Sequence, residues 1–197
     1  PAFLYREAGE RPDAYDVASR LSFGLWDSLP DPELLRAAAA GQLSTREQVS
    51  AQAERMATDP RTRAKVREFL LQWLKVDHYP DLAKDKKRFP AFDEAAATDL
   101  RTSLELFLDQ IVWSEKSDYR QLLLSTEVPL NGRLAGLYGV GGMAGDAPFQ
   151  PVALDPAERA GVLSHPYVLA SFAYLDTSSP IHRGVLIARN MLGRVLQ

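Results

Sequence analysis

The sequence contains no cysteine among its 197 residues. Without a thiol, the chain itself can form no disulfide, no thiolate metal site and no covalent c-type haem linkage. No apolar run approaches the roughly 20 residues that a membrane-spanning helix needs. Basic residues are not in excess either, because 23 Lys and Arg stand against 26 Asp and Glu. We therefore expect neither a membrane span nor a nucleic-acid partner, since nucleic-acid binders usually carry a basic stripe.

The remaining composition is that of an ordinary folded domain. Hydrophobic residues make up 46% of the chain and charged residues 25%, which argues against disorder. The length fits one medium domain, or two small domains that share a core. The chain begins at Pro1 without an initiator methionine and ends at Gln197 within a helical pattern. We therefore expect it to be a fragment of a longer protein.

Helix-capping residues recur along the chain, and apolar residues at spacings of three and four follow them. The predicted helix starts are at Asp13, Asp31, Ser44, Asp59, Asp93, Asp118, Asn131, Asp155 and Ser179. The most regular segment follows Asp93, where Leu100, Leu104 and Phe107 fall on one face. Such a pattern is typical of a helix packed along one side.

Three local details refine this prediction. Ser44 and Glu47 have the spacing of a capping box, with the serine as the cap. Pro166 is expected to kink or end the helix that starts at Asp155, because proline cannot donate a helical hydrogen bond. Strand-like alternation is nearly absent, apart from one short extended stretch at 149–154.

A loop rich in glycine and proline at 139–151 separates the long N-terminal part from a shorter C-terminal part. The C-terminal part is too short to keep a core of its own. Its last helix has Ile181, Val185, Ala188 and Leu192 on one face. The sequence therefore predicts an all-α fold, a multi-helix bundle with a smaller C-terminal helical unit docked on it.

Several short strings occur in a collinear order that covers most of the chain. They are Arg20–Trp26, Ser28–Asp31, Asp59–Arg61, Gln72–Leu74, Leu130–Leu134, Arg159–Leu163 and Ser178–Val185. In this order they resemble the paired domains of unknown function found in large exported, cytochrome-c-associated proteins of planctomycetes and myxobacteria. The resemblance implies a first domain over 13–124 and a second over 130–197, truncated at its end. It also implies export to the periplasm or cell surface, and partners among the other domains of the same protein, including a c-type cytochrome module.

The strongest candidate site is a cluster of polar residues around the start of the last predicted helix. Its members are Thr177, Ser178, Ser179, His182 and Arg183. If Ser179 caps the helix, first-turn N–H groups point outward beside hydroxyls, an imidazole and a guanidinium, which predicts an anion-binding site. The structural alternative is that Ser179 is only a cap and that Arg183 pairs with a carboxylate of another helix.

Two further chemistries are weaker alternatives. A hydrolytic triad would draw on Ser164 or Ser178, His165 or His182, and Asp176, but no Gly-x-Ser-x-Gly elbow surrounds either serine. Non-covalent haem or a metal would have to use the chain's three histidines. These are His78, His165 and His182, and their spacings match no short ligand motif. We predict no metal site and no cofactor.

The charged run 84–88 has two interpretations. It could meet an acidic partner or a phosphate, but its length and its internal Asp85 favour a solvated loop.

The most conspicuous acids and hydroxyls are explained by structural roles such as helix capping, and the three histidines do not have the spacing of a common ligand site. The sequence therefore favours a helical scaffold or interaction module of a larger exported, redox-linked protein, without chemistry of its own. For a module we expect an exposed apolar patch near the last helix. The alternative is a hydrolase or oxidoreductase domain with its site around 177–183. That enzyme would need a pocket holding His182, Arg183 and one of Asn131, Arg133 or His165.

Overall fold

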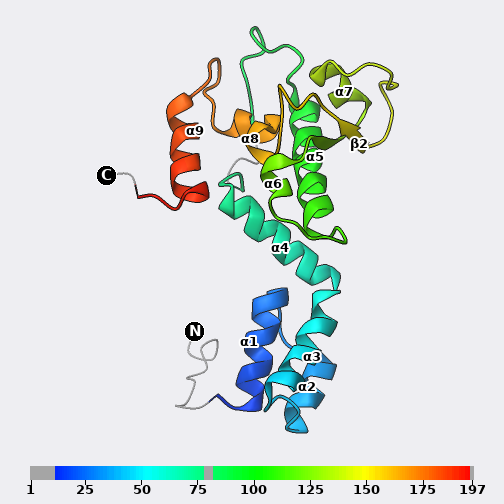
Figure 1. Cartoon of the computed structure of the whole chain (residues 1–197), viewed down its shortest axis with the longest axis vertical. Helices are drawn as coiled ribbons and strands as arrows, with labels where there is room; N and C mark the ends of the chain where they lie inside the picture. Colours follow the sequence, from blue (N-terminus) through cyan, green and yellow to red (C-terminus); the bar gives the residue numbers. More distant parts are fainter. Residues whose placement is uncertain (1–11, 78–81, 196–197) are drawn as a thin grey trace. The chain divides into compact units, whose positions relative to one another are not determined.

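The computed structural model describes residues 12–77 and 82–195. The chain divides into two compact units, Pro1–Glu68 and Phe69–Gln197, which we call unit 1 and unit 2. Both are built mainly from helices, and the described residues contain one small sheet of two short strands (Figure 1). The predicted α-helical fold class is thereby confirmed. The two-domain division at 124–130 stays a prediction.

None of the helices in the described ranges combines the length and the apolar character that crossing a membrane requires.

Unit 1 contains the first helices of the chain. Their bounds are α1 (Ala14–Trp26), α2 (Pro32–Ala39), α3 (Arg46–Ala57) and the first part of α4 (Pro60–Trp73). Asp13 and Asp31 cap α1 and α2 as predicted, each accepting a hydrogen bond from a first-turn N–H. The predicted Ser44 cap of α3 is wrong by one residue. Thr45 is the cap, because Gln48 completes its capping box and also accepts from the N–H of Ser44 at 3.0 Å.

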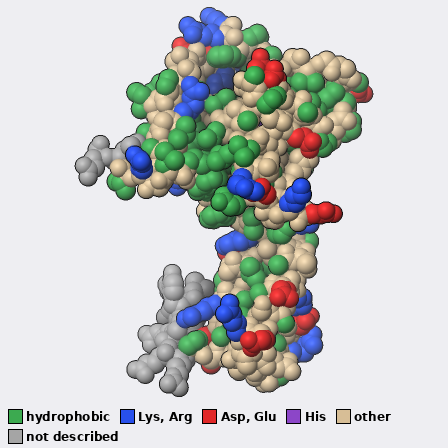
Figure 2. All heavy atoms as spheres, in the orientation of Figure 1, with side chains coloured by type: hydrophobic (Ala, Val, Ile, Leu, Met, Phe, Trp, Pro, Cys, Tyr) green, Lys and Arg blue, Asp and Glu red, His purple; other side chains and the backbone are tan. Residues whose placement is uncertain are grey.

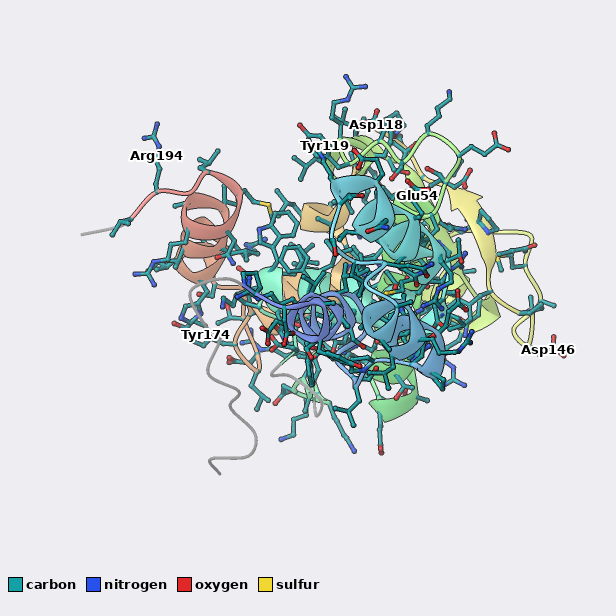
Figure 3. The ribbon with its side chains drawn as sticks, turned by 90° about the horizontal axis from the view of Figure 1, so that it is seen from below. Glu54, Asp118, Tyr119, Asp146, Tyr174 and Arg194 are labelled. Carbon is teal, nitrogen blue, oxygen red and sulfur yellow. The ribbon has the colours of Figure 1, made fainter. Side chains whose placement is uncertain are left out.

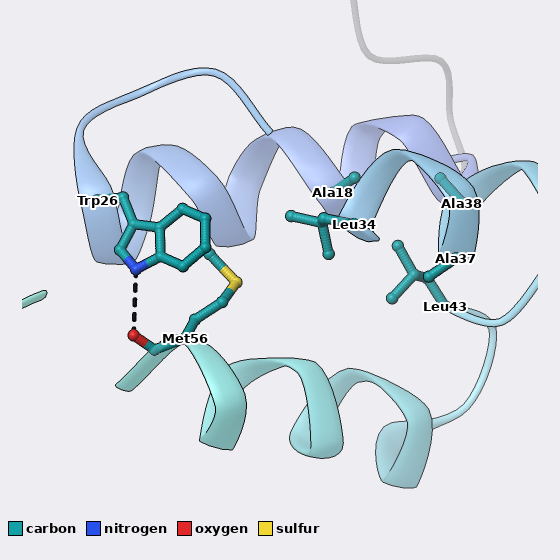
Figure 4. Packing of buried hydrophobic residues seen from close by; sticks show 7 residues of the cluster. All are labelled: Ala18, Trp26, Leu34, Ala37, Ala38, Leu43 and Met56. Atoms are coloured by element: carbon teal, nitrogen blue, oxygen red, sulfur yellow. Dashed lines mark hydrogen bonds between the residues drawn. The ribbon is translucent and has the colours of Figure 1, made fainter. Parts of the chain in front are cut away.

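The core of unit 1 forms around one tryptophan (Figure 4). Trp26 is buried at the end of α1, and its indole N–H donates to the carbonyl of Met56 at 3.1 Å. The hydroxyl of Thr62 donates to the same carbonyl at 2.7 Å. The guanidinium of Arg61 lies 3.4 Å from the centroid of the Trp26 ring, a cation–π contact. These contacts satisfy the end of α3 and join it to α1 and to the start of α4.

Unit 2 is built around the longest helix. Its elements are α5 (Glu94–Val112), α6 (Gln121–Leu124), β1 (Glu127–Leu130), α7 (Gly132–Tyr138), β2 (Gln150–Ala153), the 3-10 turn η2 (Val162–Ser164), α8 (Pro166–Ser171), α9 (Pro180–Leu186) and the π-turn η3 (Ile187–Met191). Asp93 caps α5 as predicted, and the periodic face that contains Leu100, Leu104 and Phe107 is buried. This face forms the centre of unit 2.

The small sheet places two prolines opposite each other. β1 and β2 pair antiparallel, with Pro129 facing Pro151. The N–H of Leu154 donates to the carbonyl of Thr126, so by alternation the two prolines occupy a non-hydrogen-bonded pair. Their missing N–H groups therefore cost the ladder nothing. The predicted extended stretch at 149–154 contains β2, whereas β1 was not predicted.

The helix predicted to start at Asp155 is absent, and this prediction was wrong. The Asp155 carboxylate accepts from the N–H of Ala157 at 2.8 Å, and its carbonyl accepts from the next two N–H groups, which makes one turn only. The chain then departs from a helical path at Gly161. This residue has φ +62° and donates its N–H to the carbonyl of Ser125 at 2.7 Å. Pro166 does not end a helix but begins α8, where its missing N–H is not needed.

We predict that Gly161→Ala is strongly destabilising. A Cβ at this position would lie 2.4 Å from the backbone of Leu123, in a conformation that only glycine adopts freely. Gly41→Ala is the matched control, because Gly41 has φ +68° and open space around it. Chemical denaturation should show a loss of about 1 kcal/mol for Gly41→Ala, from backbone strain alone. The loss for Gly161→Ala should be about 3 kcal/mol or more, because backbone atoms must also move. Equal losses would contradict the packing described here.

Candidate functional site

The predicted anion-binding cluster lies where α9 begins. Ser179 is buried and caps α9, with its Oγ accepting the N–H of His182 at 3.4 Å. Thr177 and Ser178 are exposed, and Arg183 is half-buried. His182 is exposed, and its ring centroid lies 5.4 Å from that of Tyr174. The structure therefore confirms the helix start and the cap, and anion binding there stays a prediction.

The predicted hydrolytic serine is turned toward its own backbone. Ser164 Oγ lies 2.9 Å from the carbonyl of Ala160 and 3.2 Å from that of Gly161, so its proton is held by carbonyl oxygens. His165, the next residue, uses its ring elsewhere. The described residues contain no group of three or more His, Asp or Glu side chains arranged to hold a metal ion. His78 lies outside the described residues.

His165 is a buried side chain of unit 2 whose two ring nitrogens both make contacts within the fold. It is 2% exposed, and its Nδ1 accepts the N–H of Tyr167 at 3.2 Å, which caps α8. This bond assigns the proton of the neutral ring to Nε2. Nε2 lies 3.2 Å from Ser103 Oγ, and that hydroxyl donates to the carbonyl of Pro129 at 2.6 Å. A continuous hydrogen-bonded chain therefore joins α8, α5 and β1.

The environment of His165 keeps the ring neutral. Burial, reinforced by the nearby positive charge of Arg159, lowers the pKa of His165 to about 3. A charged imidazolium would lose water without gaining a carboxylate partner. Both ring nitrogens are engaged within the fold, so this side chain serves packing in the folded state and has no lone pair free to bind haem iron or to accept a proton.

A very small cavity lies beside His165. It has a volume of about 10 Å³ and is lined by Tyr138 and Arg159, among others. The Tyr138 hydroxyl is buried without a hydrogen-bond partner in the described structure, and burial raises its pKa. The Arg159 guanidinium lies 5.1 Å from the centroid of the Tyr138 ring. The space suits at most a single water molecule, and it is too small for a substrate.

The charged run 84–88 lies in a loop in which Lys86, Lys87 and Arg88 are exposed, and two of its cations also bind backbone carbonyls. Lys84 Nζ donates to the carbonyls of Ala173 and Tyr174, at 3.1 and 2.9 Å. The N–H of Asp85 donates to the carbonyl of Leu175 at 2.9 Å. Arg88 continues the series by donating to the carbonyl of the following residue, Asp176, at 3.1 Å. Four successive carbonyls that follow α8 are thus satisfied, and cations suit the negative end of a helix.

A cleft of about 800 Å³ follows the solvent side of α5 and is large enough to admit a small molecule. Arg101 lies in it, with Nε 2.8 Å from Glu105 and a terminal nitrogen 3.4 Å from the Tyr167 hydroxyl. The lining carries both signs of charge. Its acidic and basic members are Asp77, Asp93, Glu94, Glu105, Lys84, Lys86 and Arg101. None of the predicted site residues lines this cleft.

The cleft was missed by sequence reasoning although part of its signal was present. Glu94, Arg101 and Glu105 fall on one face of α5, opposite the buried face. A polar helix face is usually only a solvated face, so the spacing alone does not predict a hollow. The facing wall, around Lys84 and Phe92, comes from a loop whose position depends on contacts with distant residues.

Comparison with known proteins identifies a family. A family model described as PSD4, protein of unknown function (DUF1592), matches residues 13–140. The match runs past the predicted boundary at 124–130 and ends just after α7, so β2, α8 and α9 lie outside it. No curated protein and no solved structure matches the chain at a significant level.

We predict that the free energy of unfolding falls as the pH falls from 7 to 5, because of His165. The pKa of about 3 in the folded state lies below the ordinary value near 6.5. The unfolded chain therefore binds a proton over this range while the folded chain does not. The expected loss is about 2 kcal/mol. Above pH 7 the free energy of unfolding recovers this contribution fully.

Denaturant titrations of two variants at pH 7 and pH 5 check this prediction. His165→Asn keeps a side chain able to cap α8, removes the titrating ring, and should remove this loss. His182→Asn changes an exposed histidine and should leave it in place. An undiminished loss in His165→Asn would show that other groups are responsible.

Proposed function

Because the chain belongs to the family described as protein of unknown function (DUF1592), we propose that it is a helical scaffold or interaction module without chemistry of its own. The observation that carries this proposal is the exposed apolar face of α9. Ile181 and Leu192 are exposed, as is Val195 beyond them. Figure 2 shows hydrophobic side chains spread over the side of unit 2 where α9 lies. An exposed apolar face of this kind is typical of a surface that binds another protein.

The same segment is nonetheless held firmly in place. Leu186 is buried, and Trp73 and Asn190 form two reciprocal hydrogen bonds. The indole N–H of Trp73 donates to the carbonyl of Asn190 at 2.9 Å, and the Asn190 amide donates to the carbonyl of Trp73 at 2.5 Å. An element that is anchored on one side and apolar on the other presents its free face to a partner with little ordering cost.

The polar side chains that the enzymatic alternative needs have structural roles. Asn131 caps α7 by accepting the N–H of Leu134 at 2.9 Å. Arg133 lies 3.3 Å from Asp99 in an ion pair, and His165 is buried. The large cleft along α5 is lined by none of these and by neither His182 nor Arg183. A hydrolase or oxidoreductase site around 177–183 is therefore the less favoured candidate.

The proposal also includes a cellular location and partner domains, which the family match does not give. We place the module in a larger exported protein, at the periplasm or cell surface, where its partners are other domains of the same protein, including a c-type cytochrome module. The support for this setting is the resemblance of the strings from Arg20–Trp26 to Ser178–Val185.

We expect a haem titration of the chain, followed by ultraviolet–visible absorption, to show no stoichiometric Soret shift. The reason is that both ring nitrogens of His165 are already bonded within the fold. His78→Ala, His165→Ala and His182→Ala should be titrated in parallel. A sharp Soret band that one or two of these replacements abolish would overturn the proposal and make the chain a redox domain.

We also predict that the double replacement Ile181→Asp with Leu192→Asp lowers the fluorescence of bound anilinonaphthalene sulfonate, a dye that binds exposed apolar surface. Because both side chains are exposed, the free energy of unfolding should change by no more than about 0.5 kcal/mol. Leu29→Asp, at an equally exposed leucine of unit 1, is the control. An equal loss of fluorescence in the control would show that α9 holds no special patch.

A further inference from the structure

We infer that the exposed face formed by α9, η3 and Val195, which we call the α9 face, docks an acidic amphipathic helix of a partner protein. This inference rests on the proposed function and deepens it, because it names the chemistry of the partner. Three observations carry it: the apolar side chains left exposed, the sign of the charges among them, and the rigid attachment of the segment beneath.

The apolar part of the α9 face is a helical stripe. Ile181 is 76% exposed and Leu192 is 63% exposed, and Val185 lies between them at helical spacing. Val195 continues the stripe and is 87% exposed. Tyr174 borders α9 through its ring contact with His182 and is also exposed. The apolar stripe and the Tyr174 ring beside it form a surface against which the side chains of another helix can pack.

The charged side chains of this segment have one sign. Residues 177–197 include three arginines and no Asp or Glu. In the described part of the chain, no carboxylate pairs with Arg183, Arg189 or Arg194. Some other arginines of the fold are paired with carboxylates, for example Arg55 with Asp31 at 2.8 Å and Arg120 with Asp118 at 2.8 Å. The cations of the α9 face are therefore available to carboxylates from outside, which favours an acidic partner.

The geometry directs these cations outward. The π-turn η3 adds a residue to the helical repeat, and within it Asn190 faces Trp73. Arg189 and Arg194 are exposed on the same segment. In Figure 3, Arg194 projects away from the chain just beyond α9. The helical part ends before Gly193, whose φ of +61° favours glycine, and Arg194 and Val195 follow it.

Charge also disfavours a symmetric dimer in which the α9 faces of two copies meet. Pairing two α9 faces would bring Arg183, Arg189 and Arg194 of one copy against those of the other, and like charges in contact are unfavourable. An anionic lipid surface would suit the cations, but the apolar stripe has few members, and these lie within residues 181–195. Stable interfacial insertion scales with the apolar area that is buried, and this stripe offers little of it. A partner helix of a few turns matches the length of this stripe.

Fluorescence anisotropy with two labelled peptides tests the inference on the full 197-residue chain. Both peptides are three-heptad amphipathic helices with the same leucine seam, one with glutamate and one with lysine on the remaining face. We expect the glutamate peptide to bind at least about tenfold more tightly than the lysine peptide, a difference of about 1.4 kcal/mol. Its affinity should fall as salt rises.

Matched variants locate the binding on the α9 face. Ile181→Asp, and Arg189→Glu together with Arg194→Glu, should each weaken binding of the glutamate peptide at least about fivefold. Leu29→Asp, which replaces a side chain that is also 76% exposed, and Arg36→Glu should leave it unchanged. Equal binding of the two peptides, equal effects of the control variants, or no binding would overturn the inference.

Sedimentation with vesicles distinguishes the lipid alternative. Vesicles of phosphatidylcholine alone and vesicles containing phosphatidylglycerol should both leave the chain in the supernatant. Cosedimentation with phosphatidylglycerol vesicles, without binding of the glutamate peptide, would replace the protein partner by a membrane. Failure of these experiments together with a featureless haem titration would remove the acidic partner and leave the scaffold proposal standing.

Discussion

The hydrogen-bonded chain from His165 through Ser103 to the carbonyl of Pro129 is the constraint on which unit 2 depends. It joins α8, α5 and β1 inside the core, where an unpaired polar group would cost about 1–3 kcal/mol. Each polar group in this chain of hydrogen bonds is satisfied by the next one. His165 is neutral because it is buried, its Nδ1 caps α8, and its Nε2 can then reach only Ser103. The same chain sets the position of β1, and the turn at Gly161 lies between the strand pair and η2.

Local features could be predicted from the sequence, and features that depend on distant contacts could not. Asp13, Asp31, Asp93, Asn131 and Ser179 each begin a helix as predicted, because a cap bonds to N–H groups two or three residues away. The start at Asp155 failed for the opposite reason. Its first turn forms, but Gly161 is held against Leu123, and nothing in the neighbouring residues reveals that contact. β1 was missed because its pairing with β2 is also non-local.

In the candidate site, too, local features could be predicted and long-range contacts could not. The Ser179 cap was predicted, whereas the role of Lys84 and Arg88 was not, because the carbonyls that they bind lie almost ninety residues along the chain. The apolar pattern of α9 and an exposed apolar patch near it were both expected from the sequence, although a stripe alone does not say what covers it. The His165 and Ser103 side chains bond within the core and the apolar face of α9 is exposed, and both observations support the proposal of a module that binds another protein.

Long-range proton–nitrogen correlation spectra of the histidine side chains, recorded from pH 7.5 to pH 4, test most directly whether His165 is structural. The account predicts a single neutral tautomer, with the proton on Nε2 and a bare Nδ1, unchanged throughout this range. A His165 ring whose two nitrogens shift together, with a midpoint near the ordinary value of about 6.5, would contradict it. Such a ring would be open to solvent and available for the chemistry that the scaffold proposal denies.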